Sequence, residues 1–298
     1  MAEFLARDGR RLAYDDSGGE GPPVLCLAGL SRNARDFTDL AAHLAPHFRV
    51  LRLDARGRGR SEHAEDPITE YAIPVEAGDA LALLDHLGLA RVAIVGTSRG
   101  GIVGMALGAG AAERVTALVL NDVGAVVEGR GLLRILATLG REPTDASFTD
   151  AARRLAEENR AGFPDVPMAQ WEHHAHCLYD EVDGRPVLAY DHHLRSAVAR
   201  AIDSGEPSVS LWPFFDGLKE MPVLVIRGEN SDILTGKTVE AMRRHHPTLE
   251  VLELPGRGHA PFLNEPPALA AIEGFLLAHA AGAGDAADAR ANSTGSAG

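Results

Sequence analysis

The stretch R-V-A-I-V-G-T-S-R-G-G at residues 91–101 is the part of the sequence that best indicates the fold. It begins as an apolar run typical of a buried strand and passes directly into G-T-S-R-G, which fits the pattern G-x-S-x-G. A strand followed by this pattern predicts a sharp turn into a helix, with Ser98 at the turn. Gly96 and Gly100 leave room for it, because side chains there would crowd a strained backbone. We therefore expect Ser98 to be a nucleophile whose hydroxyl faces a cleft.

The helix expected after Ser98 supplies a second feature of a reaction site. The first N–H groups of a helix have no partner within it, and they lie at the positive end of its dipole. Such groups stabilise an oxygen that gains negative charge during a reaction. We expect the N–H of Arg99 to be the first donor of this oxyanion hole.

A serine hydroxyl is a weak nucleophile, so it needs a nearby base that a carboxylate orients. His259 is the expected base, since it lies in the Gly-rich loop P-G-R-G-H-A-P after a predicted strand. Asp232 is the expected acid, because it closely follows the strand predicted at 222–227. Asp122 also follows a predicted strand and is the alternative acid, and Glu229 is a weaker one.

Predicted strands and helices alternate on both sides of the serine motif, which is typical of a mainly parallel sheet with helices on both faces. The predicted strands are 11–16, 24–28, 49–53, 91–95, 115–120, 222–227 and 249–254. The predicted helices are 34–45, 72–88, a helix from about residue 98, 237–246 and 262–280.

The alternation stops in the middle of the chain. Between residues 122 and 221 the apolar spacing is helical, with segments near 131–139, 150–159, 167–178 and 187–202. We expect an α/β core formed by 1–121 and 222–280, with a helical cap inserted at 122–221. The last residues, 281–298, are small and polar, which predicts a disordered tail.

Composition excludes several classes of protein. Hydrophobic residues make up 45% and charged residues 24% of 298, as in a globular protein. The net charge of −13, without a basic run, argues against a nucleic-acid partner. No apolar stretch is long enough for a membrane span or resembles a signal peptide, so we expect a cytoplasmic protein. The two cysteines lie far apart in sequence, and no disulfide is expected.

Four landmarks together resemble the α/β-hydrolase superfamily, over nearly the whole chain. They are L-A-G-L-S at 27–31, D-A-R-G-R-G-R-S at 54–61, G-T-S-R-G-G at 96–101 and G-R-G-H-A-P-F-L-N-E-P at 256–266. The resemblance implies an α/β-hydrolase fold that carries a serine hydrolase. A serine nucleophile argues against the dehalogenase and epoxide hydrolase branches, which need a carboxylate at this position.

The same resemblance implies a second oxyanion donor. In that superfamily the loop after the third strand usually carries His-Gly, and the residue after the glycine donates its N–H. Here Ala28 replaces the histidine and Gly29 is retained, so Leu30 is the expected donor.

Three further side chains are candidates for substrate binding. Arg32 lies near the oxyanion loop and is expected to meet a substrate carboxylate, or else to be a surface arginine. Trp171 and Trp212 lie in the predicted cap, where they either wall an apolar pocket or dock the cap onto the core.

We expect neither a metal nor a cofactor. The runs H-H-A-H-C at 173–177 and D-H-H at 191–193 contain metal-ligating residue types, but adjacent histidines on a helix diverge by about 100°. The G-K-T at 236–238 lacks the glycine of a phosphate-binding loop, and no G-x-G-x-x-G register exists.

The sequence thus predicts a serine hydrolase that cleaves a carboxylic ester or lactone through an acyl-enzyme on Ser98. The alternatives are a carbon–carbon bond hydrolase of a vinylogous diketone acid and a non-catalytic member of the fold that binds a small molecule. The expected partner is a small molecule with an ester-like carbonyl. Neither nucleic acid nor a membrane is expected, and a homodimer is left open.

Overall fold

The computed structural model describes residues 2–202 and 208–281. Its centre is an eight-stranded sheet in the order β1-β2-β4-β3-β5-β6-β11-β12, parallel from β4 to β12 and antiparallel at β1 and β2. This confirms the predicted, mainly parallel sheet. The strands are β1 (Ala2–Leu5), β2 (Arg11–Asp16), β3 (Pro23–Leu27), β4 (Arg49–Leu53), β5 (Val92–Thr97), β6 (Val115–Asn121), β11 (Val223–Gly228) and β12 (Glu250–Leu254).

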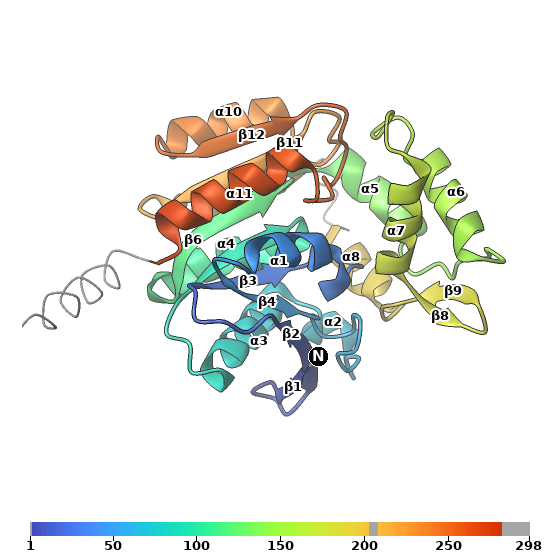
Figure 1. The fold of residues 1–298 in the computed structure, drawn as a ribbon, viewed down its shortest axis with the longest axis horizontal. Helices are drawn as coiled ribbons and strands as arrows, with labels where there is room; N and C mark the ends of the chain where they lie inside the picture. The colour runs from blue at the N-terminus through green and yellow to red at the C-terminus, as the bar shows by residue number, and fades with distance from the viewer. Residues whose placement is uncertain (1, 203–207, 282–298) are drawn as a thin grey trace, which may run out of the picture.

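Helices cover both faces of this sheet (Figure 1). One face packs against α3 (Ile73–His86), α4 (Arg99–Gly110) and α10 (Gly236–His245). The other packs against α1 (Thr38–Leu44) and α11 (Pro266–His279). The short elements of the core are η1 (Ala34–Phe37), α2 (Pro67–Glu70) and η2 (Ala112–Arg114).

Successive apolar residues of each central strand point to opposite cores. In β3, Leu25 belongs to the core under α3 and α4, whereas Val24 and Cys26 belong to the core under α1 and α11. All three are fully buried. Burial on both faces explains why these strands appear in the sequence as continuous apolar runs.

The segment between β6 and β11, predicted as a helical insertion, contains four short strands as well as helices within its described residues. Helices α5, α6 and α7 lie together beside one end of the sheet (Figure 1), and the segment also contains two short two-stranded ribbons. In the β8–β9 hairpin, Asp183 and Gly184 form the turn with positive φ angles of 50° and 75°, as a tight Asp-Gly hairpin requires. The elements are β7 (Val126–Glu128), α5 (Gly129–Thr138), α6 (Phe148–Glu158), α7 (Met168–Leu178), β8 (Tyr179–Val182), β9 (Arg185–Leu188), α8 (Leu194–Ile202), β10 (Ser208–Ser210), α9 (Trp212–Phe215) and η3 (Asp216–Leu218).

Among the described residues, no helix is long and apolar enough to cross a membrane. The predicted disordered tail falls, from residue 282 onward, outside the described part of the chain.

Glycine at the start of α4 allows this helix to approach the sheet. A Cβ built on Gly100 would lie 2.0 Å from the carbonyl oxygen of Leu27, at the end of β3. We expect Gly100→Ala to lower the free energy of unfolding by at least about 2 kcal/mol, because backbone must move to admit the methyl group. Urea unfolding measures the change.

Gly78 provides a matched control, since it lies inside α3 and an added Cβ would meet no atom within 4 Å apart from the nearby backbone of its own helix and its chain neighbours. We expect Gly78→Ala to be neutral or stabilising by up to about 1 kcal/mol, as alanine favours a helix. Equal stability of the two variants would contradict the close packing of α4 on β3.

Candidate active site

Ser98 occupies the turn between β5 and α4 that its sequence predicts. Its backbone has φ 50° and ψ −114°, a strained conformation for a residue with a side chain. The helix begins at Arg99, so the strain places the Ser98 hydroxyl beside the helix N-terminus. Such strain is tolerated because the packed strand and helix hold the turn on both sides.

His259 lies in the loop after β12, and its imidazole faces Ser98. The Nε2 atom is 2.9 Å from Ser98 Oγ, and the Nδ1 atom is 2.8 Å from Oδ2 of Asp122. A carboxylate accepts a hydrogen bond from Nδ1–H and so keeps the proton on Nδ1, which leaves Nε2 free to accept the serine proton. The structure therefore brings together carboxylate, imidazole and hydroxyl in one hydrogen-bonded row.

Asp122 directly follows β6 and is fully buried. Its Oδ1 accepts a hydrogen bond from the N–H of Gly228 at 2.8 Å, and its Oδ2 accepts one from the hydroxyl of Ser231 at 2.6 Å. Together with the imidazole of His259, these donors replace the water that burial removes from the carboxylate. They also fix its direction toward the imidazole.

The predicted acid, Asp232, forms no hydrogen bond with His259. Its two oxygens accept hydrogen bonds from Nε and Nη2 of Arg134 in α5, at 2.6 and 2.9 Å. Burial alone would raise the pKa of Asp232, but Arg134 lowers it below its ordinary value. The structure thus corrects the expected partner of His259 from Asp232 to the alternative, Asp122.

Strand geometry explains why Asp122, and not Asp232, contacts His259. The strands β6 and β11 are parallel neighbours, so the loops that follow them open at the same sheet edge. Asp122 is the first residue after β6, whereas Asp232 is separated from the end of β11 by a turn in which Ser231 points toward Asp122. Glu229, the weaker contender, accepts a hydrogen bond from the N–H of Gly256 and none from His259.

The two expected oxyanion donors lie close to the serine. Among the described residues, the backbone N–H groups of Leu30 and Arg99 have no hydrogen-bond acceptor. Arg99 directly follows Ser98 in the chain. Leu30 and Ser98 line the same cavity. A Cβ on Gly29 would lie 3.8 Å from Cβ of Ser98, so the loop after β3 approaches the nucleophile closely.

A cavity of about 240 Å³ opens over Ser98 and His259. Aromatic rings from η1, from the insertion and from the His259 loop form part of its wall, together with aliphatic and polar side chains. The aromatic members include Phe37, Phe163, Trp171 and Phe262, and the polar members include Asn159, Gln170, His174 and Asn264. Such a site suits a small ligand with an apolar part and a few hydrogen-bonding groups.

Comparison with known proteins agrees with this geometry. Residues 24–272 match the profile of the family described as "Alpha/beta hydrolase family". The chain belongs to the alpha/beta hydrolase family.

Relatives within the family carry hydrolase names. A 3-hydroxybutyrate-oligomer hydrolase of Cupriavidus necator is 33% identical over 276 residues, covering 89% of this chain and 92% of that protein. A 2-(acetamidomethylene)succinate hydrolase of Mesorhizobium japonicum is 28% identical, covering 83% and 84%. The crystal structure of an alpha/beta hydrolase from Novosphingobium aromaticivorans is 41% identical with a TM-score of 0.85, covering 92% of this chain and 96% of the other. The protein is a hydrolase.

The three predicted substrate-binding side chains of this hydrolase have different surroundings. Arg32 lines the cavity, but its Nε and Nη2 donate to Asp36 at 2.7 and 2.5 Å, and its other edge faces His174. Trp171 lines the cavity and is buried. Trp212 is not a lining residue of this cavity; it packs in α9 against Phe215 and against His245 of α10, which agrees with the docking alternative.

His174 is neutral in this cavity. Burial, followed by the charge of Arg32, holds its pKa well below the ordinary value. Arg32 is thus compensated by Asp36 and covered by an uncharged ring, and its expected contact with a substrate carboxylate stays a prediction.

Several residues of the site belong to no sequence motif and were not predicted. Asn159, Gln170 and Asn264 lie in the cavity wall, and Ser231 orients Asp122. Only Ser231 had a usable signal, since a small polar residue in a loop beside a parallel strand can reach its neighbour's loop. The others depend on how the insertion folds over the sheet.

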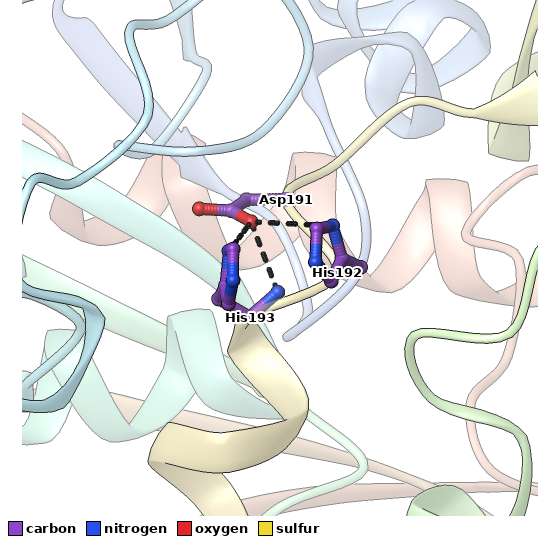
Figure 2. Close-up of side chains that lie close together, drawn as sticks. All are labelled: Asp191, His192 and His193. Atoms are coloured by element: carbon purple, nitrogen blue, oxygen red, sulfur yellow. Dashed lines mark hydrogen bonds and ion pairs between the residues drawn. The ribbon is translucent and has the colours of Figure 1, made fainter.

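The run D-H-H at 191–193 forms a compact group away from the cavity (Figure 2). One ligand atom from each of Asp191, His192 and His193 lies within 4.8 Å of the others. Asp191 already accepts hydrogen bonds from the N–H of His193 at 2.9 Å and from the hydroxyl of Tyr71 at 2.5 Å. These bonds tie the start of α8 to the core, and the absence of a metal stays a prediction.

Asparagine substitutions can show which carboxylate, Asp122 or Asp232, assists His259 in catalysis. We expect Asp122→Asn to lower kcat for ester hydrolysis by about 10³–10⁴-fold, because an amide cannot hold the Nδ1 proton and stabilise the imidazolium. Asp232→Asn, which removes the charge opposite Arg134, is the matched control and should change kcat less than about tenfold. Steady-state kinetics on folded variants distinguishes them, and the reverse ranking would restore Asp232 as the acid.

Proposed function

We propose that this hydrolase is a serine esterase that cleaves carboxylic esters through an acyl-enzyme on Ser98. The observation that carries the proposal is the continuous row Asp122–His259–Ser98, of which Ser98 and His259 line a cavity. Hydrolase names among the relatives support the reaction class.

The acylation step uses each member of the row once. Ser98 Oγ forms a bond to the ester carbonyl carbon while its proton moves to Nε2 of His259. The carbonyl oxygen becomes an oxyanion, which the N–H groups of Leu30 and Arg99 stabilise. When the tetrahedral centre collapses, the bond to the alkoxy group breaks, and His259 returns the proton to that group as it leaves as an alcohol.

Deacylation repeats the chemistry with water. His259 takes one proton of a water molecule whose oxygen attacks the acyl carbon. The bond to Ser98 Oγ then breaks and Oγ recovers the proton, so that the carboxylic acid is released and the enzyme is restored. Asp122 keeps the imidazole oriented and stabilises its charged form throughout.

Short hydroxyacyl esters are the substrate class that we favour. The relative from Cupriavidus necator is named for hydrolysis of 3-hydroxybutyrate oligomers. A cavity of about 240 Å³ has room for a short acyl unit, and Asn159, Gln170 and Asn264 offer hydrogen-bonding groups for a substrate hydroxyl or carboxylate.

Hydrolysis of esters tests both the nucleophile and the pocket. We expect the wild type to hydrolyse p-nitrophenyl acetate and butyrate faster than the decanoate, and to cleave the linear dimer and trimer of 3-hydroxybutyrate. Ser98→Ala should lose at least about 10⁴-fold in kcat, because no other group can form the acyl-enzyme. Activity that survives in Ser98→Ala would exclude the mechanism. An inactive wild type would favour carbon–carbon hydrolysis or a binding role.

A cysteine is an alternative nucleophile that chemical modification can exclude. Burial raises the pKa of Cys177, which lines the cavity, to about 11, and that of Cys26 to about 12. Both thiols are therefore protonated at pH 8 and poorly reactive. We expect iodoacetamide at pH 8 to leave ester hydrolysis intact, whereas a fluorophosphonate abolishes it. Inactivation by iodoacetamide in parallel with labelling of Cys177 would point to a thiol instead.

A further inference from the structure

The two expected oxyanion donors are connected by three buried charged side chains. Arg58 comes from the loop after β4, Glu76 from α3, and Arg99 from the residue after the nucleophile. Their side chains are 1%, 6% and 15% exposed. The reaction as described above uses none of these side chains.

Arg58 holds the loop that carries Leu30. Its Nε donates to the carbonyl oxygen of Leu30 at 2.8 Å, and its Nη1 donates to Oε1 of Glu76 at 2.7 Å. Leu30 has its expected donor N–H on one side of Cα and this carbonyl on the other, so the bond restricts the direction of the N–H. The family's usual histidine is replaced by Ala28, and Arg58 supplies a brace for the same loop.

Arg99 is tied to the same carboxylate. Its Nε donates to Oε2 of Glu76 at 2.8 Å, and its Nη2 donates to the carbonyl oxygen of Tyr71 at 2.7 Å. One carboxylate therefore spans the two arginines, with one oxygen for each. Burial would raise the pKa of Glu76, but the charges of Arg58 and Arg99 hold it below its ordinary value, so Glu76 is ionised.

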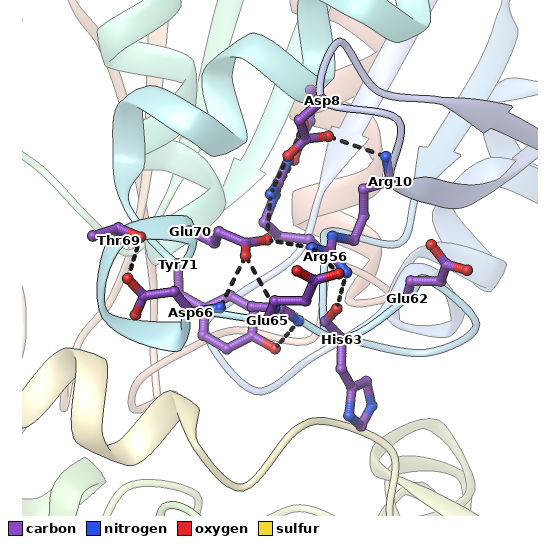
Figure 3. A network of polar contacts seen from close by, with 12 residues as sticks. Asp8, Arg10, Arg56, Glu62, His63, Glu65, Asp66, Thr69, Glu70 and Tyr71 are labelled. Atoms are coloured by element: carbon purple, nitrogen blue, oxygen red, sulfur yellow. Dashed lines mark hydrogen bonds and ion pairs between the residues drawn. The ribbon is translucent and has the colours of Figure 1, made fainter.

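The charges of this group do not cancel. Two guanidinium groups and one carboxylate leave one positive charge, held in a poorly hydrated region next to both expected donors. A fixed positive charge near a developing oxyanion favours the transition state more than the neutral ester. The neighbouring Arg56 differs, since it is matched by several carboxylates, of which Figure 3 shows Asp8 and Glu70.

We propose that Arg58, Glu76 and Arg99 form a positioning group that sets the oxyanion hole, with Glu76 fixing the distance between the Leu30 and Arg99 donors. The inference rests on the proposed esterase function and adds residues that act through the backbone of others. It predicts a loss of transition-state stabilisation with little change in substrate binding.

Glu76→Gln is the direct test, with Asp79→Asn as its matched control. Asp79 lies one turn later in α3, is equally buried, and pairs with Arg56 through two hydrogen bonds of 2.7 and 2.6 Å. We expect Glu76→Gln to lower kcat by about 10²-fold with KM within about threefold, as a misplaced oxyanion donor does. Affinity for a trifluoromethyl ketone, which mimics the tetrahedral oxyanion, should fall in parallel, whereas affinity for the product acid should not. Asp79→Asn should leave kcat within about threefold.

A second variant covers the case in which Glu76→Gln does not fold. Arg99→Met removes the more exposed arginine and leaves Arg58 paired with Glu76, so one positive and one negative buried charge remain and compensate each other. We expect kcat to fall about tenfold at unchanged KM, because the backbone donor is kept but its anchor and the excess charge are lost. Near-wild-type kcat in folded Glu76→Gln or Arg99→Met, an equal loss in Asp79→Asn, or a loss confined to KM would overturn the proposal.

Phosphonylation of Ser98 by a fluorophosphonate provides a readout that needs no ester turnover. The phosphoryl oxygen occupies the same hole, so the labelling rate should fall about 10²-fold in Glu76→Gln and remain near wild type in Asp79→Asn. A wild type that neither labels at Ser98 nor hydrolyses esters would remove the proposed function and this inference with it. Normal wild-type reactivity with an unaffected Glu76→Gln would remove the inference alone.

Discussion

The hydrogen bond between Asp122 and Nδ1 of His259 joins two loops whose residues are 137 positions apart in the chain. It forms because β6 and the strands β11 and β12 are laid side by side and parallel, so that their following loops open at one sheet edge. Without this bond the imidazole would lack both a defined tautomer and a direction toward Ser98. The geometry of the whole site therefore depends on strand order in the core.

Burial of charged side chains is the main free-energy cost of forming this site. Asp122 is fully buried, and an isolated carboxylate would be strongly disfavoured there. The N–H of Gly228, the hydroxyl of Ser231 and the imidazole together replace its hydration. On the other side of Ser98, Glu76 is stabilised in the same way by two arginines. Both carboxylates are held rigidly because each oxygen has a fixed partner.

The local parts of the site could be predicted from the sequence. Ser98 and His259 were found because short-range chemistry defines them: a glycine-flanked turn for the serine and a loop after a buried strand for the histidine. The choice of acid could not be settled this way, since Asp122 and Asp232 both follow neighbouring parallel strands. The side-chain contacts distinguish the two acids, because Arg134 pairs with Asp232 and Ser231 donates a hydrogen bond to Asp122.

Predictions for the insertion were less complete, for a related physical reason. Periodicity shows that a helix has an apolar face but not what that face contacts, so Trp171 and Trp212 looked alike although only Trp171 reaches the cavity. The ribbons β7–β10 and β8–β9 are only three or four residues long per strand, which is too short for an alternating pattern to show. The fold of the core was predictable because continuous apolar strands and helices repeat along it.

The proposed mechanism requires that Ser98 is covalently acylated during turnover. Rapid acid quenching of the enzyme with a short-chain p-nitrophenyl ester, followed by peptide mass spectrometry, tests it most directly. We expect a mass increase equal to one acyl group on the peptide that contains Ser98, and none on peptides that contain Cys26 or Cys177. Rapid ester turnover without an adduct under quenching fast enough to trap one, or with the acyl group on another residue, would contradict it.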